Sequence, residues 1–228
     1  MARGAMPRAV SRGAIMPYNL RAGLSFCIIE RRCFFIDVDR NRYFALPDRL
    51  NHAFLRLQSG AGDAADVRDL ARIGVLQDGP ATDRMRPCAY MAPSASVDSA
   101  GARSWSNLGP VTAAYLRAAH TLRQGSLANV TRRLEMARSR APSGPVSTAM
   151  DEIASATASA KRLIGHYDLC LRWSLATALV LIRSGIGAKI IFGVCPGPFI
   201  AHCWVQVDDR IVGDDLERVD MFTPILVL

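Results

Sequence analysis

Three residues in the last third of the chain carry the side chains that cysteine-based acyl transfer requires. They are Cys170, His202 and Asp214, in that order along the sequence. A thiol can act as the nucleophile, an imidazole as the base that removes its proton, and a carboxylate as the group that orients the imidazole. These residue types predict a candidate catalytic triad, which the surrounding elements must bring together.

The segment around Cys170 predicts a helix. Residues 168–184 are apolar nearly all round, which is typical of a buried helix, and Cys170 lies in its first turn. The free backbone N–H groups and the helix dipole at that end favour a thiolate and could stabilise an oxyanion. Taken alone, a free cysteine in such a helix is more often a small buried hydrophobic residue.

Three short strands are expected after this helix, over residues 188–194, 201–207 and 210–213. Alternation along the second strand places His202 on one face and Cys203 on the other. Asp214 follows the third strand, twelve residues after His202. Pairing of the two strands can therefore bring this carboxylate to the imidazole, with Asp215 as an adjacent rival.

Composition and charge argue against two classes of function. The chain has 228 residues, 50% of them hydrophobic, and a net charge of +8. Its 28 basic residues form no dense basic stripe of the kind that nucleic acid binding favours. No apolar run reaches the ~18 residues that crossing a bilayer needs. We therefore expect neither nucleic acid nor a membrane as a partner.

The cysteines and the N-terminus bear on location. The six cysteines form no CxxC pair and no Cys/His spacing typical of a metal site, so we expect no metal. In a chain of this size they predict reduced thiols in a cytoplasmic protein. Residues 1–15 carry three arginines and no acid, and they lack the apolar segment of a secretory signal. They predict a basic tail, with Met16 as an alternative start.

The N-terminal part predicts three short strands, over residues 25–30, 33–38 and 42–46. Asp48 can cap a helix over residues 49–58. Asp63 can start a second helix that ends near residue 72, with Val67 and Leu70 facing inward. Three strands followed by helices form a winged-helix-like outline.

Residues 92–110 predict a boundary, because thirteen of these nineteen residues are Ala, Ser, Gly or Pro. Helical patterns then begin at Pro110, at Ser126 and at about Ser147, and they are expected to cover a core. The fold class predicted for the whole chain is α+β. It combines the N-terminal domain, a helical region, and a core made of one helix and an antiparallel sheet.

The segments CLRWSLATALVLIRSGIGAKIIFGV and PFIAHCWVQVDDRIVGDD carry a family resemblance. They resemble the transglutaminase-like superfamily, whose core is of the papain type, and more closely the leader peptidases of lasso peptide maturation. The shared pattern is a Cys that begins a CL-x-x-S-L helix, a G-I-x-A strand entry and an F-x-A-H-x-W-V motif. The resemblance implies Cys170 as nucleophile, His202 as base and Asp214 as orienting group. That family often has Ala-Trp-Val-Glu after the His, where this chain has Cys203 and Gln206.

The N-terminal outline resembles the PqqD-like leader-recognition domain of systems that modify ribosomally made peptides. In that family the leader peptide adds a strand beside the third strand and touches the last helix, a form of β-augmentation. The alternatives are a DNA-binding winged helix or a structural subdomain. The implied leader-binding residues are Arg42, Tyr43, Phe44, Ala45, Leu46, Val67 and Leu70.

Together the two resemblances imply a fused B protein of lasso peptide biosynthesis. Its expected parts are a tail (1–15), a leader-recognition domain (16–80), a linker (81–109) and a peptidase domain (110–228). The expected partners are a lasso precursor peptide and an asparagine-synthetase-like cyclase. No cofactor is expected, because the chain has no Walker-type phosphate loop and ATP use is assigned to the cyclase. The alternatives are a transglutaminase-like amide-modifying enzyme and a non-catalytic scaffold that delivers the precursor.

Overall fold

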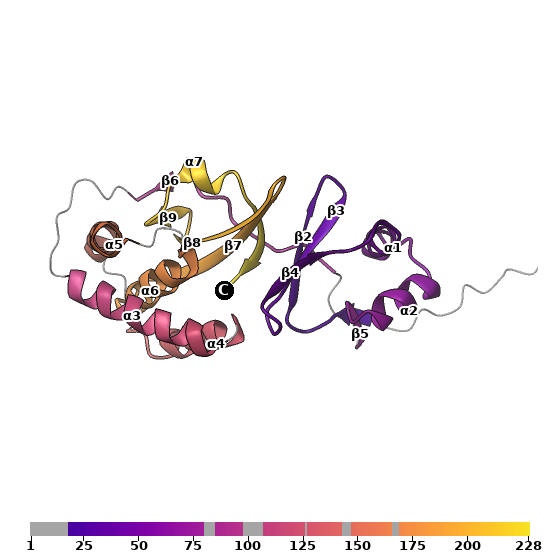
Figure 1. Ribbon diagram of the computed structural model, residues 1–228, viewed down its shortest axis with the longest axis horizontal. Helices are drawn as coiled ribbons and strands as arrows, with labels where there is room; N and C mark the ends of the chain where they lie inside the picture. The colour runs from indigo at the N-terminus through magenta and orange to yellow at the C-terminus, as the bar shows by residue number, and fades with distance from the viewer. Residues whose placement is uncertain (1–17, 80–84, 98–106, 126, 143–146, 166–168) are drawn as a thin grey trace, which may run out of the picture. The chain divides into compact units, whose positions relative to one another are not determined.

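The computed structural model describes the chain in six stretches, residues 18–79, 85–97, 107–125, 127–142, 147–165 and 169–228 (Figure 1). The expected basic tail and the expected helix start at Ser126 lie outside these residues. The chain divides into two compact units. The first contains residues 1–22 and 46–86, and the second contains residues 23–45 and 87–228. The domain boundaries expected from the sequence remain a prediction.

The first unit contains two helices and a small sheet. Strands β1 (Tyr18–Leu20) and β5 (Leu76–Asp78) pair antiparallel, and helices α1 (Asp48–Gln58) and α2 (Ala64–Arg72) contact each other. The N-cap of α1 is Pro47, without a side-chain cap, so the expectation that Asp48 caps this helix is wrong. Pro has a fixed φ that suits a helix start, and the helix therefore begins at Asp48 itself.

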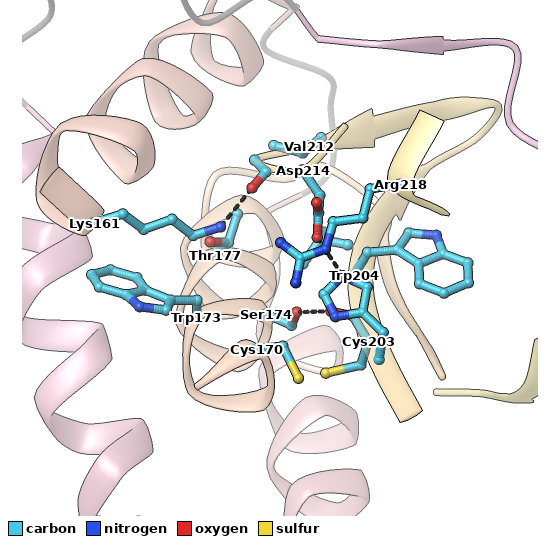
Figure 2. A pocket seen from close by; sticks show the side chains of 13 residues that line it. Lys161, Cys170, Trp173, Ser174, Thr177, Cys203, Trp204, Val212, Asp214 and Arg218 are labelled. Atoms are coloured by element: carbon cyan, nitrogen blue, oxygen red, sulfur yellow. Dashed lines mark hydrogen bonds and ion pairs between the residues drawn. The ribbon is translucent and has the colours of Figure 1, made fainter. Parts of the chain in front are cut away.

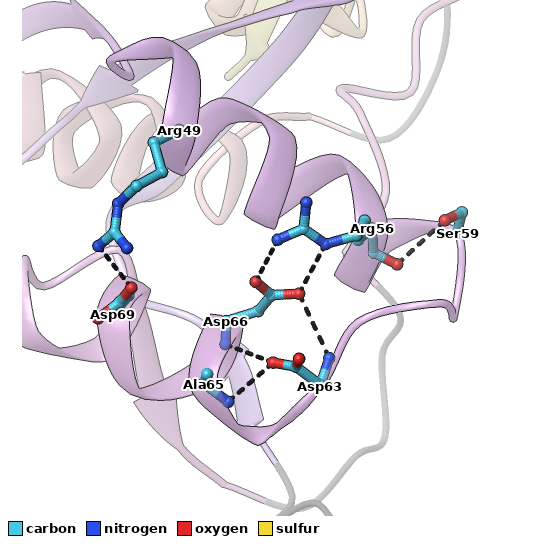
Figure 3. A network of polar contacts seen from close by, with 7 residues as sticks. All are labelled: Arg49, Arg56, Ser59, Asp63, Ala65, Asp66 and Asp69. Atoms are coloured by element: carbon cyan, nitrogen blue, oxygen red, sulfur yellow. Dashed lines mark hydrogen bonds and ion pairs between the residues drawn. The ribbon is translucent and has the colours of Figure 1, made fainter.

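Asp63 caps α2 as predicted and forms a complete capping box. Its carboxylate accepts hydrogen bonds from the backbone N–H groups of Ala65 and Asp66, at 2.8 and 2.9 Å (Figure 3). The Asp66 side chain accepts one from the backbone of Asp63 and makes a two-pronged ion pair with Arg56 of α1. These contacts join the two helices at the start of α2.

The second unit contains the three strands predicted near the N-terminus. They are β2 (Leu24–Ile29), β3 (Arg32–Asp37) and β4 (Arg42–Ala45), which form an antiparallel sheet in the order β2-β3-β4. The connection between β2 and β3 has positive φ at Glu30 and Arg31, as a tight hairpin of two residues requires. The strand patterns on either side predicted this hairpin, but they placed its turn one residue later, at residues 31–32.

Four helices of the second unit surround its main core. They are α3 (Leu108–Gln124), α4 (Leu127–Arg138), α5 (Ser147–Ile164) and α6 (Cys170–Arg183). Figure 1 shows α6 beside β7 and β8, and α3, α4 and α5 all contact α6. Every residue from Trp173 to Ile182 is buried, so α6 is the central helix that the sequence predicted.

A five-stranded sheet packs against α6, in the order β10-β7-β8-β9-β6. Its strands are β7 (Ala188–Pro196), β8 (Phe199–Val207), β9 (Arg210–Val212), β10 (Thr223–Val227) and β6 (Ala95–Ser96). The sequence analysis did not predict β6 or β10. Residues 95–96 lie in the segment expected to be a linker, and they pair in parallel with β9. The short helix α7 (Leu216–Val219) connects β9 to β10.

The two faces of the sheet alternate as predicted along β8. Cys203 and Val205 belong to the core that includes α6, whereas Trp204 belongs to a smaller cluster with Val219 of α7. The larger cluster also contains buried residues of β2 and β3, such as Ile36. The catalytic half of the chain and the N-terminal meander therefore share one core.

Candidate active site

Cys170 is the first residue of α6. The N-cap residue, Leu169, makes no side-chain hydrogen bond to the start of the helix. The sequence explains the position of Cys170 locally, because its uninterrupted apolar segment forms a buried helix. This helix packs against β8 of the sheet. Residues of α5, α6, β8 and the β9–α7 connection line one pocket around the thiol, and Figure 2 shows their side chains. The cavity measures about 20 Å³, which is room for about one water molecule.

His202 and Asp214 form a direct pair in this pocket. The distance between Nε2 of His202 and Oδ2 of Asp214 is 2.6 Å, and the side chains are 6% and 13% exposed. Because Nε2 faces the carboxylate, Nδ1 is the ring nitrogen left for the thiol. The His202 ring also lies near Phe222 and Trp204, with centroid distances of 5.2 and 6.2 Å. The imidazole is therefore oriented by a carboxylate and lies near two aromatic rings.

The pairing of β8 explains how these groups meet. Strand β9 pairs only with residues Val205–Val207 of β8, so β9 leaves the edge of β8 beside His202 uncovered. Gly213 then turns the chain with a φ of +74°, a conformation that favours glycine. The next residue, Asp214, reaches the imidazole at this uncovered edge.

The structure distinguishes Asp214 from its neighbour. Asp215 is exposed and acts as the N-cap of α7, where its carboxylate accepts a hydrogen bond of 2.8 Å from the backbone of Glu217. The backbone N–H of Asp215 donates to Oδ1 of Asp214 at 2.9 Å. Asp214 is therefore the carboxylate that faces His202, and Asp215 supports it through the backbone.

The electrostatics of the pair suit acid–base work. Burial lowers the pKa of His202, but hydrogen bonds with Asp214 and Cys170 outweigh this and raise it above its ordinary value. Burial raises the pKa of Asp214, but hydrogen bonds with His202 and the Asp215 backbone outweigh this and lower it. Both shifts favour the charged forms, a protonated imidazole beside a carboxylate.

Cys203 lies nearer the reactive thiol than the sequence indicated. Alternation does place it on the opposite face of β8 from His202, but α6 packs on that face and carries Cys170 with it. A hydrogen bond between the two thiols lowers the pKa of Cys170, with a further lowering from His202. The same hydrogen bond, together with burial, raises the pKa of Cys203. These shifts favour the thiolate form at Cys170 and the thiol form at Cys203.

Four further polar side chains line the pocket, and the sequence had assigned none of them a role. They are Lys161, Ser174, Thr177 and Arg218. Ser174 donates to the backbone carbonyl of Cys203 at 3.0 Å and so ties α6 to β8. Lys161 donates to the carbonyl of Gly213 at 2.6 Å. Only Ser174 had a signal, since it belongs to the CL-x-x-S-L pattern.

The residues predicted to bind a leader differ in how deeply their side chains are buried. Leu46 and Leu70 are 3% and 0% exposed, so their side chains offer no surface to a peptide in this structure. Arg42, Tyr43, Phe44 and Ala45 form β4, which pairs with β3 on one side only. The remaining predicted residue, Val67, is half-buried on α2.

Tyr43 links β4 to the pocket. Its ring meets Phe199 of β8 edge-on at a centroid distance of 5.8 Å, three residues before His202. Burial raises the pKa of Tyr43, with smaller contributions from the charges of Cys203 and Cys170. Tyr43 therefore packs against the core cluster that contains Cys203.

Two negative observations concern other classes of site. In the stretches that the structure describes, no group of three or more His, Cys, Asp or Glu side chains is arranged to hold a metal ion. No helix in those stretches combines the length and the apolar character needed to span a membrane.

Comparison with protein families matches residues 112–227 to the transglutaminase-like superfamily. The chain belongs to the transglutaminase-like superfamily. Members of this superfamily are cysteine-protease-like enzymes, and the match spans all three candidate catalytic residues. No curated protein and no solved structure matches the chain.

Proposed function

We propose that this protein is a cysteine peptidase that removes the leader from a lasso-type precursor peptide. The observation that carries the proposal is the arrangement of Cys170 with the His202–Asp214 pair, whose distance is 2.6 Å. A thiol with a lowered pKa at a helix start, next to an oriented imidazole, is the setting of a cysteine nucleophile.

The proposed reaction has two steps. The thiolate of Cys170 attacks the carbonyl carbon of the last leader residue, and the backbone N–H groups at the start of α6 can stabilise the oxyanion. His202 gives its proton to the leaving amine as the peptide bond breaks, which frees the core peptide. Water, losing a proton to His202, then attacks the thioester and releases the leader acid. Asp214 holds the imidazole orientation and stabilises its charged form throughout.

The leader is proposed to bind along the free edge of β4. An edge strand offers unpaired backbone groups, so an extended peptide can add to it as a further strand. Its exposed side chains, Arg42 and Ala45, would contact the bound peptide. An asparagine-synthetase-like cyclase would then use the freed core N-terminus, so this enzyme is the second proposed partner.

The cleavage experiment uses the purified chain, a precursor peptide and water enriched in ¹⁸O. Mass spectrometry should show free core peptide and a leader acid that carries one ¹⁸O atom. A leader joined to an added amine, with no free acid, would instead indicate an amide-modifying enzyme. Precursor that binds tightly but stays intact would indicate a delivery scaffold.

The binding experiment titrates a fluorescent leader peptide into the full chain. Phe44→Ala and Phe44→Pro both remove the ring that stacks on Phe35 at 5.0 Å, but only Pro also removes a backbone N–H and disturbs the edge. Weaker binding by the Pro variant than by the Ala variant is the expected result. Equal affinity of the two variants would place the leader elsewhere.

A further inference from the structure

The chain uses lysine at only two positions, Lys161 and Lys189, while its other 26 basic residues are arginines. Lys189 is exposed on β7. Lys161 is half-buried at the end of α5 and lines the same pocket as Cys170 and His202. In a chain that otherwise uses arginine, one of its two ammonium groups therefore lies inside the candidate active site.

Lys161 holds the turn that carries Asp214. Its Nζ donates to the carbonyl oxygen of Gly213 at 2.6 Å, and Figure 2 shows the side chain extending from α5 to this turn. Thr157, one helical turn before Lys161, lies against the other side of Gly213: a Cβ atom at that glycine would approach the Thr157 methyl group to 3.3 Å. Helix α5 therefore contacts the turn at two points.

The same helix is tied to α6, which carries the nucleophile. The hydroxyl groups of Thr157 and Thr177 are 3.3 Å apart in the core. A continuous set of contacts thus runs from α6 through α5 to Gly213, and from there to the carboxylate that orients His202. The positions of thiol and carboxylate are both fixed against α5.

Charge gives Lys161 a second effect. The ionisable groups around it are Asp214, Arg218, Cys170 and Cys203. Burial lowers the pKa of Lys161, Asp214 and the two thiols act to raise it, and Arg218 lowers it further. In return the ammonium group helps to lower the pKa of Asp214. When Cys170 is a thiolate and His202 is an imidazolium, their two charges cancel. The Asp214 carboxylate then adds one negative charge, which the Lys161 ammonium group is positioned to balance.

We infer that Lys161 is a positioning residue of this active site, which fixes the Gly213–Asp214 turn and balances the charge of the Asp214 carboxylate. The inference rests on the proposed function for its reaction, but the positioning concerns Cys170 and His202 whatever the substrate is. Lysine suits the place because its ammonium group is compact, whereas the pocket has room for only about one further water molecule. A planar guanidinium would have to meet the Gly213 carbonyl oxygen with a different geometry.

The test compares Lys161→Met and Lys161→Arg with Lys189→Met as the matched control. Lys161→Met should lower kcat by roughly tenfold to a hundredfold, with KM changed less than about twofold, because a charged hydrogen bond that orients Asp214 is lost. Lys161→Arg should recover only part of this loss. Lys189→Met should match the unchanged chain. A loss confined to KM, or full activity in Lys161→Met, would overturn the inference.

A second readout does not depend on any peptide. The rate at which iodoacetamide alkylates Cys170, followed by mass spectrometry across pH, reports the thiolate–imidazolium pair directly. In Lys161→Met the acid limb should move to higher pH, because the ammonium group whose charge favours the Cys170 thiolate is lost. An unchanged profile would overturn the inference. If the profile shifts but no chain cleaves the precursor, the proposed substrate is wrong and the positioning role stands.

If Lys161→Met does not fold, the unchanged chain supplies the test. Reductive methylation with ¹³C-formaldehyde labels both lysines, and Lys189→Arg assigns their signals. The Lys161 signal should titrate below the ordinary lysine value of 10.5 and should shift again when Cys170 is alkylated. A Lys161 signal that titrates at or above that value and is unaffected by alkylation would contradict a Lys161 ammonium coupled to the active site.

Discussion

Cys170 and Cys203 are both cysteines, but their surroundings shift their pKa values in opposite directions. Each thiol shapes the other, since their hydrogen bond lowers the pKa of Cys170 and raises that of Cys203. His202 lies beside Cys170 and adds to the first effect. A nucleophile must be a thiolate at working pH, so the geometry favours Cys170 over its neighbour.

Cys170→Ala should abolish precursor cleavage while leaving the affinity for the leader nearly unchanged, because the thiol serves the chemistry and β4 serves the binding. Cys203→Ala is the control. It should keep cleavage, although the pKa of Cys170 should rise once its hydrogen-bond partner is gone. Cleavage is followed by mass spectrometry of the products. Near-normal turnover by Cys170→Ala would move the nucleophile assignment to Cys203.

Asp214→Asn should reduce cleavage by at least about a hundredfold, because an amide does not stabilise an imidazolium as a carboxylate does. Asp215→Asn should have a small effect, since asparagine caps a helix about as well as aspartate does. The measurement is kcat/KM for the two variants side by side. Equal losses would mean that the cap of α7 matters as much as the contact with His202.

The reactivity of Cys170 should begin well below the ordinary cysteine pKa of 9.0. Hydrogen bonds with Cys203 and His202 lower the pKa of the Cys170 thiol to about 4, and the raised pKa of His202 keeps the imidazolium charged beyond its ordinary value of 6.5. Alkylation should therefore rise in acid as the thiolate forms, level off, and change again only above pH 6.5. A single rise centred near 9.0, the ordinary value for a cysteine, would contradict the pairing.

At the scale of elements, two of the three candidate catalytic side chains lie where an element begins or ends. Cys170 begins α6, and Asp214 follows β9 after the turn at Gly213. His202 lies within β8 but beside the edge that β9 leaves uncovered. Helix starts and strand ends leave backbone groups and side chains free for substrate, which is why the site forms there.

The first unit offers an element-scale prediction at the start of α2. Asp66→Asn should destabilise it by about 1–2 kcal/mol, because Asp66 is buried, completes the capping box and pairs with Arg56 through two hydrogen bonds. Asp69→Asn, whose ion pair with Arg49 is exposed, should cost less than about 0.5 kcal/mol. Urea unfolding measures both. Equal effects would show that burial of Asp66 contributes nothing.

The pH dependence follows from the sign of the Asp66 shift. The hydrogen bond from Arg56 lowers the pKa of Asp66 below its ordinary 3.8, so the folded state favours the charged form. This stabilisation is present at neutral pH and is lost as the pH falls through the lowered pKa. The stability difference between Asp66→Asn and the unchanged chain should therefore shrink in acid, and a difference that grows there would contradict the assignment.

At the scale of the whole molecule, the two compact units alternate along the sequence instead of following one another. Residues 23–45 belong to the second unit, although residues 46–86 of the first unit follow them directly. Ile36 of β3 is fully buried in the core cluster that also holds α6. The meander proposed to bind the leader is therefore part of the folding unit that carries Cys170.

Ile36→Ala should lower the stability of the catalytic unit by about 2–5 kcal/mol, because it opens a cavity in a shared core. Ile73→Ala, at a side chain that is 43% exposed in the first unit, should change little. The measurement is the temperature at which the buried thiol of Cys203 becomes rapidly alkylated. If Cys203 stays protected to the same temperature in Ile36→Ala, the two segments do not share a core.

The sequence by itself determined what depends on neighbours along the chain. The apolar segment after Cys170 specified α6, alternation specified the faces of β8, and two neighbouring strand patterns specified the β2–β3 hairpin. Such patterns act within a few residues, so they can be read without knowing the fold. The His202–Asp214 contact was also predictable, since a hairpin separates the two residues.

Only the tertiary structure decided which distant residues meet. It placed Lys161 at the Gly213 turn and brought Cys203 against Cys170, because α5 and α6 pack with particular faces toward the sheet. It also added β6 and β10 to that sheet and put the N-terminal meander in the catalytic unit. These outcomes depend on strand partners and helix faces chosen by burial over the whole chain, and local periodicity carries no information about that choice.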